Sequence, residues 1–513
     1  MIKNLKKLIF SRVFIVWLLI LIQFALILVA AIQFSRYFVF YTAAAFILAF
    51  IFFIKILNTD QNMAYKLAWS ILIFIFPAFG VAIYMIFGGN RLSKRTVKKM
   101  LSINSGMEQN AGRQENVISS LAAADPDAAK QSRYILNGSS CPPFDGCAVE
   151  YFRSGEEMFG PFLDELRKAK KYIFIEYFII GKGEMWDKIH AILTEKVAEG
   201  VDVRVIYDDM GSIMANEMKF PKKLNEEGIK CYVFHRFLPI LSGVQNNRDH
   251  RKICVIDGVT AFTGGVNIAD EYINSIERFG YWKDNAVMLR GKAAWSFAVM
   301  FLSMWEYLDK VPENERGDYS SFRPADADLD AISGSGVIQP YTDNPLDREP
   351  VGESVYLNMI GSARDYIWIT TPYLIIDEQM KEALCLAAKS GVDVRIVTPG
   401  IPDKKIIKST TEAFYPRLIE DGVKIYEYDP GFIHAKTFLC DDKYATVGTI
   451  NLDYRSFYLH FECGMWMYGT DCIADIKNDF CDIFEHCTKI EKWNTGVFHQ
   501  LKCGILEFLA PLF

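Results

Sequence analysis

Two histidine–lysine pairs in this chain combine groups that can attack, move protons and hold negative charge. His250 and Lys252 stand in the stretch HRKICVID, and His434 and Lys436 stand in HAKTFLCD. An imidazole can act as a nucleophile or as a general acid and base, and an ammonium group beside it can stabilise negative charge. A lone histidine is more often structural, but a histidine that shares a strand face with a lysine indicates chemistry.

The elements that must position the first pair are an apolar strand and its hairpin partner. Side chains alternate along a strand, so His250 and Lys252 share one face and Arg251 takes the other. Asp257-Gly258 is a hairpin-turn signal, and residues 259–263 have the pattern of the returning strand. The first pair is therefore predicted at the start of a β-hairpin.

The second pair repeats this arrangement. His434 and Lys436 share a strand face, and Asp441-Asp442 marks the turn that follows. An asparagine, Asn267 or Asn451, lies seventeen residues after the histidine in each copy. Two H-x-K-x4-D stretches with the same downstream asparagine are difficult to explain by chance, so the chain is duplicated.

The flanking segments predict an α/β fold for each copy. Residues 172–178 and 196–209 parallel residues 366–374 and 387–400, and in each copy the second apolar strand is entered through G-V-D-V-R. A helix between two such strands is a β–α–β signature. We expect two pseudo-symmetric halves, each a mixed β-sheet flanked by helices, with a single site where the halves meet.

The duplicated motif resembles that of the phospholipase D superfamily, and the remaining sequence resembles bacterial cardiolipin synthases. The resemblance covers nearly the whole chain. It departs mildly at Asp249, where the family often has Asn, and at Thr449, where Ser is usual. The segments that carry it are IEYF (175–178), EGVDVRVIYDDMGS (199–212), RDHRKICVIDG (248–258), TGGVNIADEY (263–272), WKD (282–284), HAKTFLCDD (434–442), VGTINLDYRS (447–456) and FE (461–462).

The resemblance implies a phosphatidyl transfer between two phosphatidylglycerol molecules that yields cardiolipin and glycerol. One histidine would attack phosphorus and form a covalent phosphatidyl-histidine, while the other protonates the departing glycerol and then deprotonates the second alcohol. The resemblance assigns the nucleophile to His250 and the acid/base role to His434. Four side chains would stabilise charge in the transition state: Lys252, Lys436, Asn267 and Asn451.

Five carboxylates are candidates for catalytic or supporting roles. Each histidine requires a carboxylate to fix its tautomer, and the family positions for this role are Asp284 and Glu462. Glu176 is expected to contact hydroxyl groups of the acceptor. Asp257 and Asp441 complete the two motifs as candidate catalytic residues, although strand parity favours a role in fixing the turn.

No metal or other cofactor is expected. The lysines beside the histidines can neutralise the phosphate oxygens that a divalent ion would otherwise hold. The eleven cysteines are scattered without a C-x-x-C pair, which is typical of reduced thiols in the cytosol and not of a zinc site. The other histidines are interpreted as structural: His190, His235, His460, His486 and His499.

The N-terminal part predicts a membrane anchor. A hydrophobic content of 51% is high for a soluble protein, and apolar runs cover residues 13–32, 38–54 and 67–87. Basic residues precede the first run and follow the third, so the positive-inside rule requires an even number of crossings. Three runs give an odd number, so either the N-terminus lies outside or one run is re-entrant or interfacial. We expect a multi-pass protein of the cell membrane with a cytoplasmic catalytic part.

The predicted domains are a transmembrane region (1–90), a linker (91–135) and two halves (136–325 and 326–513). The net charge of −6 argues against a nucleic-acid partner, and phosphatidylglycerol and other anionic membrane lipids are the expected partners. Three alternatives stay open: a related phosphatidyltransferase or phospholipase D hydrolase with another acceptor, a nuclease, and a non-catalytic lipid-binding scaffold. The apolar tail, residues 504–513, is expected to lie against the membrane or the catalytic part.

Overall fold

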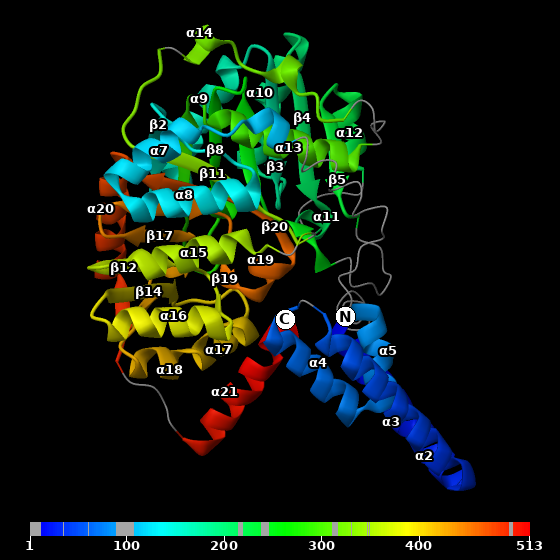
Figure 1. The fold of residues 1–513 in the computed structure, drawn as a ribbon. Helices are drawn as coiled ribbons and strands as arrows, with labels where there is room; N and C mark the ends of the chain where they lie inside the picture. Colours follow the sequence, from blue (N-terminus) through cyan, green and yellow to red (C-terminus); the bar gives the residue numbers. More distant parts are fainter. Residues whose placement is uncertain are drawn as a thin grey trace. The chain divides into compact units, whose positions relative to one another are not determined.

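The structure is a computed structural model with two units (Figure 1). The N-terminal unit comprises residues 1–91 with 239–244 and 511–513, and the α/β unit comprises residues 92–238 and 245–510. The structure describes residues 12–33, 35–59, 61–88, 107–213, 219–236, 246–309, 316–329, 331–345, 347, 349–491 and 496–512.

The N-terminal unit is helical, as its apolar runs predict. Its helices are α2 (Arg12–Gln33), α3 (Ser35–Leu57), α4 (Met63–Ile75) and α5 (Pro77–Phe87). Among the described residues, one stretch, Tyr37–Leu57 within α3, is long and apolar enough to cross a membrane by length and composition. The other apolar helices of this unit fall short of that length over their described residues.

The third apolar run forms two helices. It breaks before Pro77, which has no N–H to continue α4 and begins α5 instead. The rings of Trp69 and Tyr84 then lie 5.3 Å apart. A Cβ on Gly80 would lie 2.7 Å from the Cα of Ile73, so glycine permits the close approach of the two helices. α4 and α5 therefore form an antiparallel hairpin.

The first half of the α/β unit is built on a seven-stranded sheet in the order β2-β10-β8-β7-β3-β4-β5. Strands β3, β4 and β5 are parallel, and β7 and β8 form an antiparallel hairpin beside β3. The strands are β2 (Ala148–Phe152), β3 (Tyr172–Tyr177), β4 (Asp202–Asp208), β5 (Lys230–Phe234), β7 (Lys252–Ile256), β8 (Thr260–Gly264) and β10 (Ala286–Arg290).

The second half repeats this plan in a larger sheet, with the order β1-β11-β20-β18-β17-β12-β14-β15-β21. Strands β12, β14 and β15 are parallel, and β17 and β18 form the hairpin. The strands are β1 (Phe144–Asp145), β11 (Val337–Asp343), β12 (Tyr366–Thr370), β14 (Asp393–Pro399), β15 (Lys424–Tyr428), β17 (Thr437–Cys440), β18 (Tyr444–Gly448), β20 (His460–Tyr468) and β21 (Cys487–Ile490), with the separate pair β13 (Leu374–Ile375) and β19 (Leu452–Asp453).

Helices pack on both faces of the first sheet. Ile173 and Ile175 of β3 face α9 and α10, and on the opposite face Phe301 of α13 stacks on Phe174 at 4.5 Å. The helices of this half are α9 (Gly155–Lys168), α10 (Glu184–Ala198), α11 (Asp209–Ser212), α12 (Phe220–Glu226), α13 (Ala294–Leu308) and α14 (Asp326–Leu329), with 3-10 turns η2 (Asp270–Ile273) and η4 (Ser320–Phe322).

The second half carries more helices, and it includes a segment that precedes the first half in sequence. α7 and α8 contact each other, α8 contacts α15 (Figure 1), and β1 pairs with β11. The helices are α7 (Glu115–Ala124), α8 (Pro126–Ser139), α15 (Val351–Ser362), α16 (Glu378–Lys389), α17 (Lys405–Ala413), α18 (Tyr415–Glu420), α19 (Tyr454–Tyr458), α20 (Cys472–Glu485) and α21 (Val497–Leu509), with the 3-10 turn η5 (Ala510–Leu512). The predicted fold of two pseudo-symmetric α/β halves is confirmed.

Two short parallel pairings join the halves. β6 (Arg248–Asp249) of the first half pairs with the start of β20, and β9 (Tyr281–Lys283) pairs with β16 (Gly431–Ile433) of the second half. In each pairing, the residues before a motif histidine lie beside the residues before a carboxylate of the other half. We call β6, β9, β16 and the start of β20 the exchanged strands, because they position each histidine next to a carboxylate of the other half.

Candidate active site

The two motif histidines each hydrogen-bond a carboxylate from the opposite half. Nδ1 of His250 lies 3.0 Å from both carboxylate oxygens of Glu462, and Nδ1 of His434 lies 2.7 Å from Oδ2 of Asp284. In sequence, Asp284 follows His250 and Glu462 follows His434, so the pairing crosses the duplication. All four side chains are buried.

The exchanged strands explain this crossing. The backbone N–H of His250 donates to the carbonyl oxygen of Phe461 at 2.9 Å, one residue before Glu462. In the same way the N–H of His434 donates to the carbonyl oxygen of Lys283 at 2.7 Å, one residue before Asp284. The same backbone contact therefore sets both histidine–carboxylate pairs.

The two lysines are buried beside their histidines and are held by the backbone. Nζ of Lys252 donates to the carbonyl oxygen of His250 at 2.6 Å, and Nζ of Lys436 donates to that of His434. Burial lowers the pKa of Lys252 to about 8 and that of Lys436 to about 7. An anion between the lysines would favour their charged forms, because opposite charge offsets the cost of desolvation.

Burial also determines the charge of the histidines. Burial, followed by the charges of Lys252 and Lys436, holds the pKa of His250 well below its usual value. The pKa of His434 is lowered to about 4 by burial and then by the charge of Lys436, and Asp284 opposes this shift. Burial raises the pKa of Asp284, but His434 and Lys436 lower it by more, so this carboxyl is ionised. With no anion bound, both imidazoles are neutral near pH 7.

The residue that follows each hairpin, Gly265 or Thr449, packs directly against a carboxylate of the site. The hydroxyl of Thr449 donates to Oε2 of Glu462 at 2.5 Å. Its counterpart is Gly265, where a Cβ would lie 1.9 Å from Oδ1 of Asp284. Asp284 thus requires glycine in the first half, whereas in the second half a hydroxyl fills the space and binds the carboxylate.

The asparagines of the two motifs are buried in different surroundings. Oδ1 of Asn267 accepts from the N–H of Ile179 at 3.1 Å, and its Nδ2 donates to the hydroxyl of Tyr272 at 2.7 Å. The ring of Tyr272 lies 5.5 Å from that of His434. Oδ1 of Asn451 is buried without a hydrogen-bond partner among the described residues. The Oδ1 atom of Asn451 can therefore accept a hydrogen bond from a donor at the site. Asn267 holds Tyr272, which packs beside His434.

Asp257 and Asp441 lie at the turn ends of β7 and β17, away from the histidines. The carboxylate of Asp257 accepts from the backbone N–H groups of residues 170, 171 and 172, each at 2.8 Å. Asp441 accepts from those of residues 364, 365 and 366 at 2.7 to 2.9 Å. Each aspartate thus fixes its turn to the start of β3 or β12. The catalytic role considered for them gives way to this structural one.

Glu176 does not occupy the position expected of a residue that contacts an acceptor. It is fully buried on the Arg251 face of the sheet, and its Oε1 lies 2.5 Å from Arg251, which also contacts Asp249 at 3.3 Å. Burial raises the pKa of Glu176 well above its usual value. Strand parity explains the difference, because Glu176 pairs with Ile253, and the histidine and lysine point to the other face.

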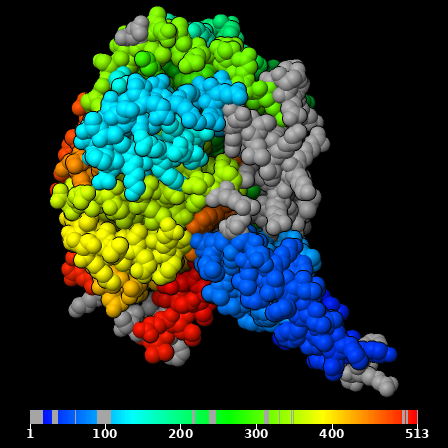
Figure 2. All heavy atoms as spheres, viewed as in Figure 1, coloured from blue at the N-terminus to red at the C-terminus, as the bar shows by residue number. Residues whose placement is uncertain are grey.

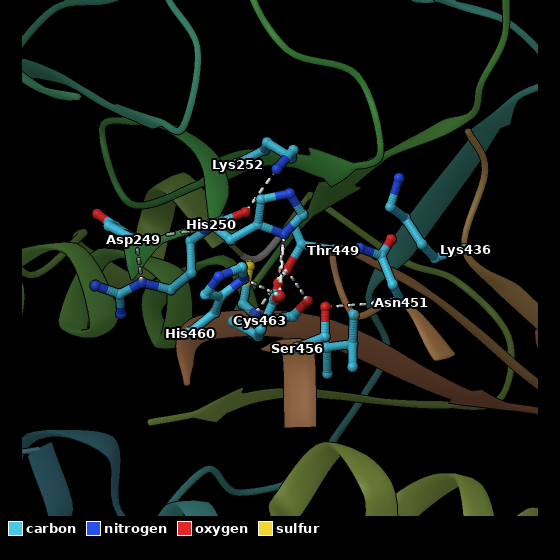
Figure 3. Close-up of polar contacts among 12 residues, drawn as sticks. Asp249, His250, Lys252, Lys436, Thr449, Asn451, Ser456, His460 and Cys463 are labelled. Atoms are coloured by element: carbon cyan, nitrogen blue, oxygen red, sulfur yellow. Dashed lines mark hydrogen bonds and ion pairs between the residues drawn. The ribbon is translucent and has the colours of Figure 1, made fainter. Parts of the chain in front are cut away.

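His460, interpreted from the sequence as structural, lies beside His250 (Figure 3). The two rings are 5.5 Å apart, and Nδ1 of His460 lies 3.6 Å from Oε1 of Glu462. Trp282 holds the matching place in the first half, 5.5 Å from His434. Both residues stand two positions before the carboxylate, and this offset is the sequence signal that could have identified them.

His250, His460 and Glu462 are also a group whose possible metal-ligand atoms lie within 4.8 Å of one another. The positive charges of Lys252 and Lys436 lie close enough to lower the pKa of His250, and the same charges repel a cation. The chemistry of the site thus fits an anion better than a metal ion. The charge of His434 also lowers the pKa of His250, so the two motif histidines are close enough to interact. Two imidazoles with two lysines beside them can transfer a phosphoryl-type group through a covalent intermediate.

Comparison with known proteins places these features in a family. The family model described as "Cardiolipin synthase, PLD-like domain" matches residues 162–305 and 356–484, and the one described as "Phospholipase_D-nuclease N-terminal" matches residues 47–89. An uncharacterised protein of Streptococcus mutans is 42% identical over 461 residues, which are 89% of this chain and 98% of that protein.

Two further comparisons concern a protein with a named activity and a protein of known structure. A protein of Geobacillus thermodenitrificans named cardiolipin synthase is 34% identical over 84% of this chain and 85% of its own. The crystal structure of phosphatidylserine synthase from Haemophilus influenzae covers 75% of this chain and 98% of its own, with a TM-score of 0.53 and 16% identity. The latter likeness shows a shared fold.

Proposed function

The chain belongs to the cardiolipin synthase family with a phospholipase D-like domain, and from this premise we propose that it joins two phosphatidylglycerol molecules into cardiolipin and releases glycerol. The observation that carries the proposal is the pair of crossed histidine–carboxylate contacts, His250 with Glu462 and His434 with Asp284. They give one buried site two histidines that can act in turn.

In the first step His250 is the nucleophile. Its Nε2 attacks the phosphorus of one phosphatidylglycerol, and the bond from phosphorus to the glycerol headgroup oxygen breaks. Glu462 accepts the Nδ1 proton in a hydrogen bond and stabilises the cation that forms on the ring. His434, protonated when the anionic phosphodiester is bound, gives its proton to the departing glycerol.

In the second step His434 is the base. It removes the proton from the terminal hydroxyl of a second phosphatidylglycerol, and that oxygen attacks the phosphatidyl group on His250. The phosphorus–nitrogen bond breaks, cardiolipin forms, and His434 is again protonated. Two in-line displacements give net retention of configuration at phosphorus.

The lysines stabilise the phosphate, and Asn451 has a different role. Lys252 and Lys436 lie on the strand faces of the histidines and supply positive charge for the non-bridging oxygens. The unpartnered Oδ1 of Asn451 suits a hydroxyl or ammonium donor, so we assign it to orientation. No cofactor is assigned, because the site supplies its own positive charge.

We propose that the protein lies in the cell membrane with two crossings and a cytoplasmic catalytic part. α4 is 13 residues long and α5 is 11, so each spans well under the hydrocarbon thickness of roughly 30 Å. Their antiparallel hairpin returns the chain to the side where it began. We propose that α2, which is 22 residues long in total, crosses the membrane together with α3, and two crossings give the even number that the basic clusters require. The domain boundaries at residues 90 and 325 are part of this proposal. The predicted linker, residues 91–135, contains α7 and most of α8, and α8 packs on α15 and β11 of the second half.

Product analysis tests the function. Purified protein incubated with phosphatidylglycerol vesicles should yield cardiolipin and glycerol, also with a chelator present. Phosphatidic acid as the main product would identify a hydrolase, and another diester would identify a different acceptor. Cleavage of single-stranded DNA without any lipid product would identify a nuclease. Complete loss with chelator, restored by Mg²⁺ alone, would contradict the metal-free chemistry.

A further inference from the structure

The C-terminal helix α21 exposes an apolar stripe. Val497, Leu501 and Ile505 are spaced four residues apart, so they lie on one helix face, and they are 79%, 62% and 51% exposed. Cys503 lies on a different face and is buried. Three large apolar side chains aligned outward are unusual on a protein surrounded only by water.

The neighbouring helix α17 extends this stripe. α17 and α21 contact each other, and Nζ of Lys502 donates to the hydroxyl of Ser409 at 3.3 Å. Ile406 of α17, one turn before Ser409, is 54% exposed, and Ile401 in the preceding loop is 40% exposed. We call these five residues, Ile401, Ile406, Val497, Leu501 and Ile505, the α17–α21 face. Figure 2 shows α21, in red, at the surface of the α/β unit.

Lysines accompany the apolar residues of the α17–α21 face. Lys404, Lys405 and Lys502 are exposed. Two acidic residues nearby are more covered. The side chain of Asp403 is 17% exposed, accepts a hydrogen bond from Tyr373 and lies 3.8 Å from Nζ of Lys404. Burial raises the pKa of Glu507, which lowers its tendency to ionise. Basic groups around an apolar stripe are typical of helices that lie in an anionic membrane surface.

The α17–α21 face is connected to His434. The N–H of Ile401 donates to the carbonyl oxygen of Gly431 at 3.3 Å, and β16 runs from Gly431 toward the histidine. The ring of Phe432 lies 5.9 Å from the ring of His434. Phe432 also lines a small cavity together with Ile407 of α17. A backbone hydrogen bond at Ile401 and the buried ring of Phe432 thus connect the loop before α17 to the second histidine.

We propose that the α17–α21 face lies in the headgroup region of an anionic bilayer and is the surface by which a diacyl lipid reaches His434. The proposal rests on the proposed function for the identity of the lipid. Lipid contact is a property of the exposed face and does not require turnover, so the two can be tested separately.

Photocrosslinking tests this contact. The full-length protein carries a benzophenone amino acid at position 501 and is reconstituted into vesicles of phosphatidylglycerol and phosphatidylethanolamine. Irradiation should attach lipid to residue 501. The matched control carries the same group at position 386 on α16, because Leu386 is equally apolar and 67% exposed but lies outside the face. It should give at least fivefold less lipid adduct.

A second variant tests the role of charge. K404E/K405E/K502E should lower the lipid adduct at position 501 at least threefold in anionic vesicles and leave it unchanged in phosphatidylcholine. Three results would overturn the proposal. Residue 501 could crosslink to a second copy of the chain, it could crosslink to the N-terminal helices of the same chain, or it could form no crosslink at all. Lipid adducts on a protein that makes no cardiolipin would support this inference and contradict the proposed function.

Discussion

Glu462 in the second half of the fold binds Nδ1 of His250 in the first half through both carboxylate oxygens, each at 3.0 Å. Asp284 in the first half binds His434 in the second at 2.7 Å. For the two motif histidines, the carboxylate that orients the ring comes from the other half in each case. Loss of a carboxylate should therefore be felt by the histidine of the other half.

Glu462→Gln and Asp284→Asn should affect different steps. E462Q removes the partner of His250, so formation of the adduct on residue 250 should slow by roughly 10³- to 10⁴-fold. D284N weakens His434 as a base, so the adduct should form and persist. E353Q is a control, because burial raises the pKa of Glu353 to about 8 and the residue is already protonated at neutral pH. Rapid-quench mass spectrometry of labelled peptides distinguishes the steps, and an exchanged pattern would contradict the crossed assignment.

The histidine substitutions should separate attack from resolution. H434A lacks the base for the second alcohol, so a phosphatidyl adduct should accumulate on His250 after incubation with phosphatidylglycerol. H250A should form no adduct. Peptide mass spectrometry reads both variants. An adduct on His434 in the H250A protein would reverse the roles of the histidines, and inversion at phosphorus in the wild type would contradict the covalent intermediate.

Lys436→Met should abolish activity and stabilise the protein. The pKa of Lys436 is about 7 in the folded state and about 10.5 in the unfolded chain. Between these two pH values unfolding takes up a proton, so the free energy of unfolding rises with pH through this window. Below pH 7 the buried lysine is charged, and its full destabilisation of the folded state is present. K436M should raise the melting temperature at pH 6.5 and flatten its pH dependence from 7 to 10. Inorganic phosphate should raise the melting temperature of the wild type only. A lower melting temperature in K436M would contradict the buried-charge interpretation.

Asp441→Ala should unfold more easily yet remain catalytically competent. Its carboxylate accepts three backbone N–H groups at the start of β12, and their loss should cost about 2–3 kcal/mol. The control is D442N, whose exposed contact with Lys477 is worth less than about 1 kcal/mol. Thermal unfolding and initial rates at 20 °C check this. A D441A protein of normal stability without activity would restore a catalytic role.

His460 should act as a positioning residue for Glu462. Both its ring nitrogens are buried without a hydrogen-bond partner among the described residues, and Nδ1 lies 3.6 Å from Oε1 of Glu462. A small movement would let His460 donate to this oxygen when His250 carries the adduct. H460N retains a donor and should keep most activity, whereas H460F should lose about tenfold in kcat, equivalent to about 1.4 kcal/mol. W282F, the matching change in the first half, should not mimic this loss. Equal rates in H460F and H460N would contradict the role.

Much of the fold was predictable because the duplication repeats its periodicity. The hairpins after His250 and His434 are found as strand β7 with β8 and strand β17 with β18. The crossed carboxylates were not predictable, since the short pairings of β6 with β20 and of β9 with β16 connect residues far apart in sequence. Local patterns carry no information about pairs so distant.

The errors at individual residues have local physical causes. Glu176 lies on the strand face opposite to the histidines. Its pairing with Ile253 on the neighbouring strand determines this face, and the sequence around Glu176 alone does not reveal that pairing. The apolar run at residues 67–87 does not by itself show that the chain reverses at Pro77, because proline can also be tolerated within a membrane helix. His460 was overlooked because a single histidine carries no partner in its own motif.

The exchange of carboxylates also limits how the two halves can change over evolutionary time. A single copy of the repeat, with one histidine and one acid of its own, would need a second copy of itself to complete either pair. Once fused, neither repeat can lose its acid without disabling the other, even where its own histidine is untouched. Selection then preserves the acid of each repeat because the histidine of the other repeat requires it. The two repeats can therefore change only together.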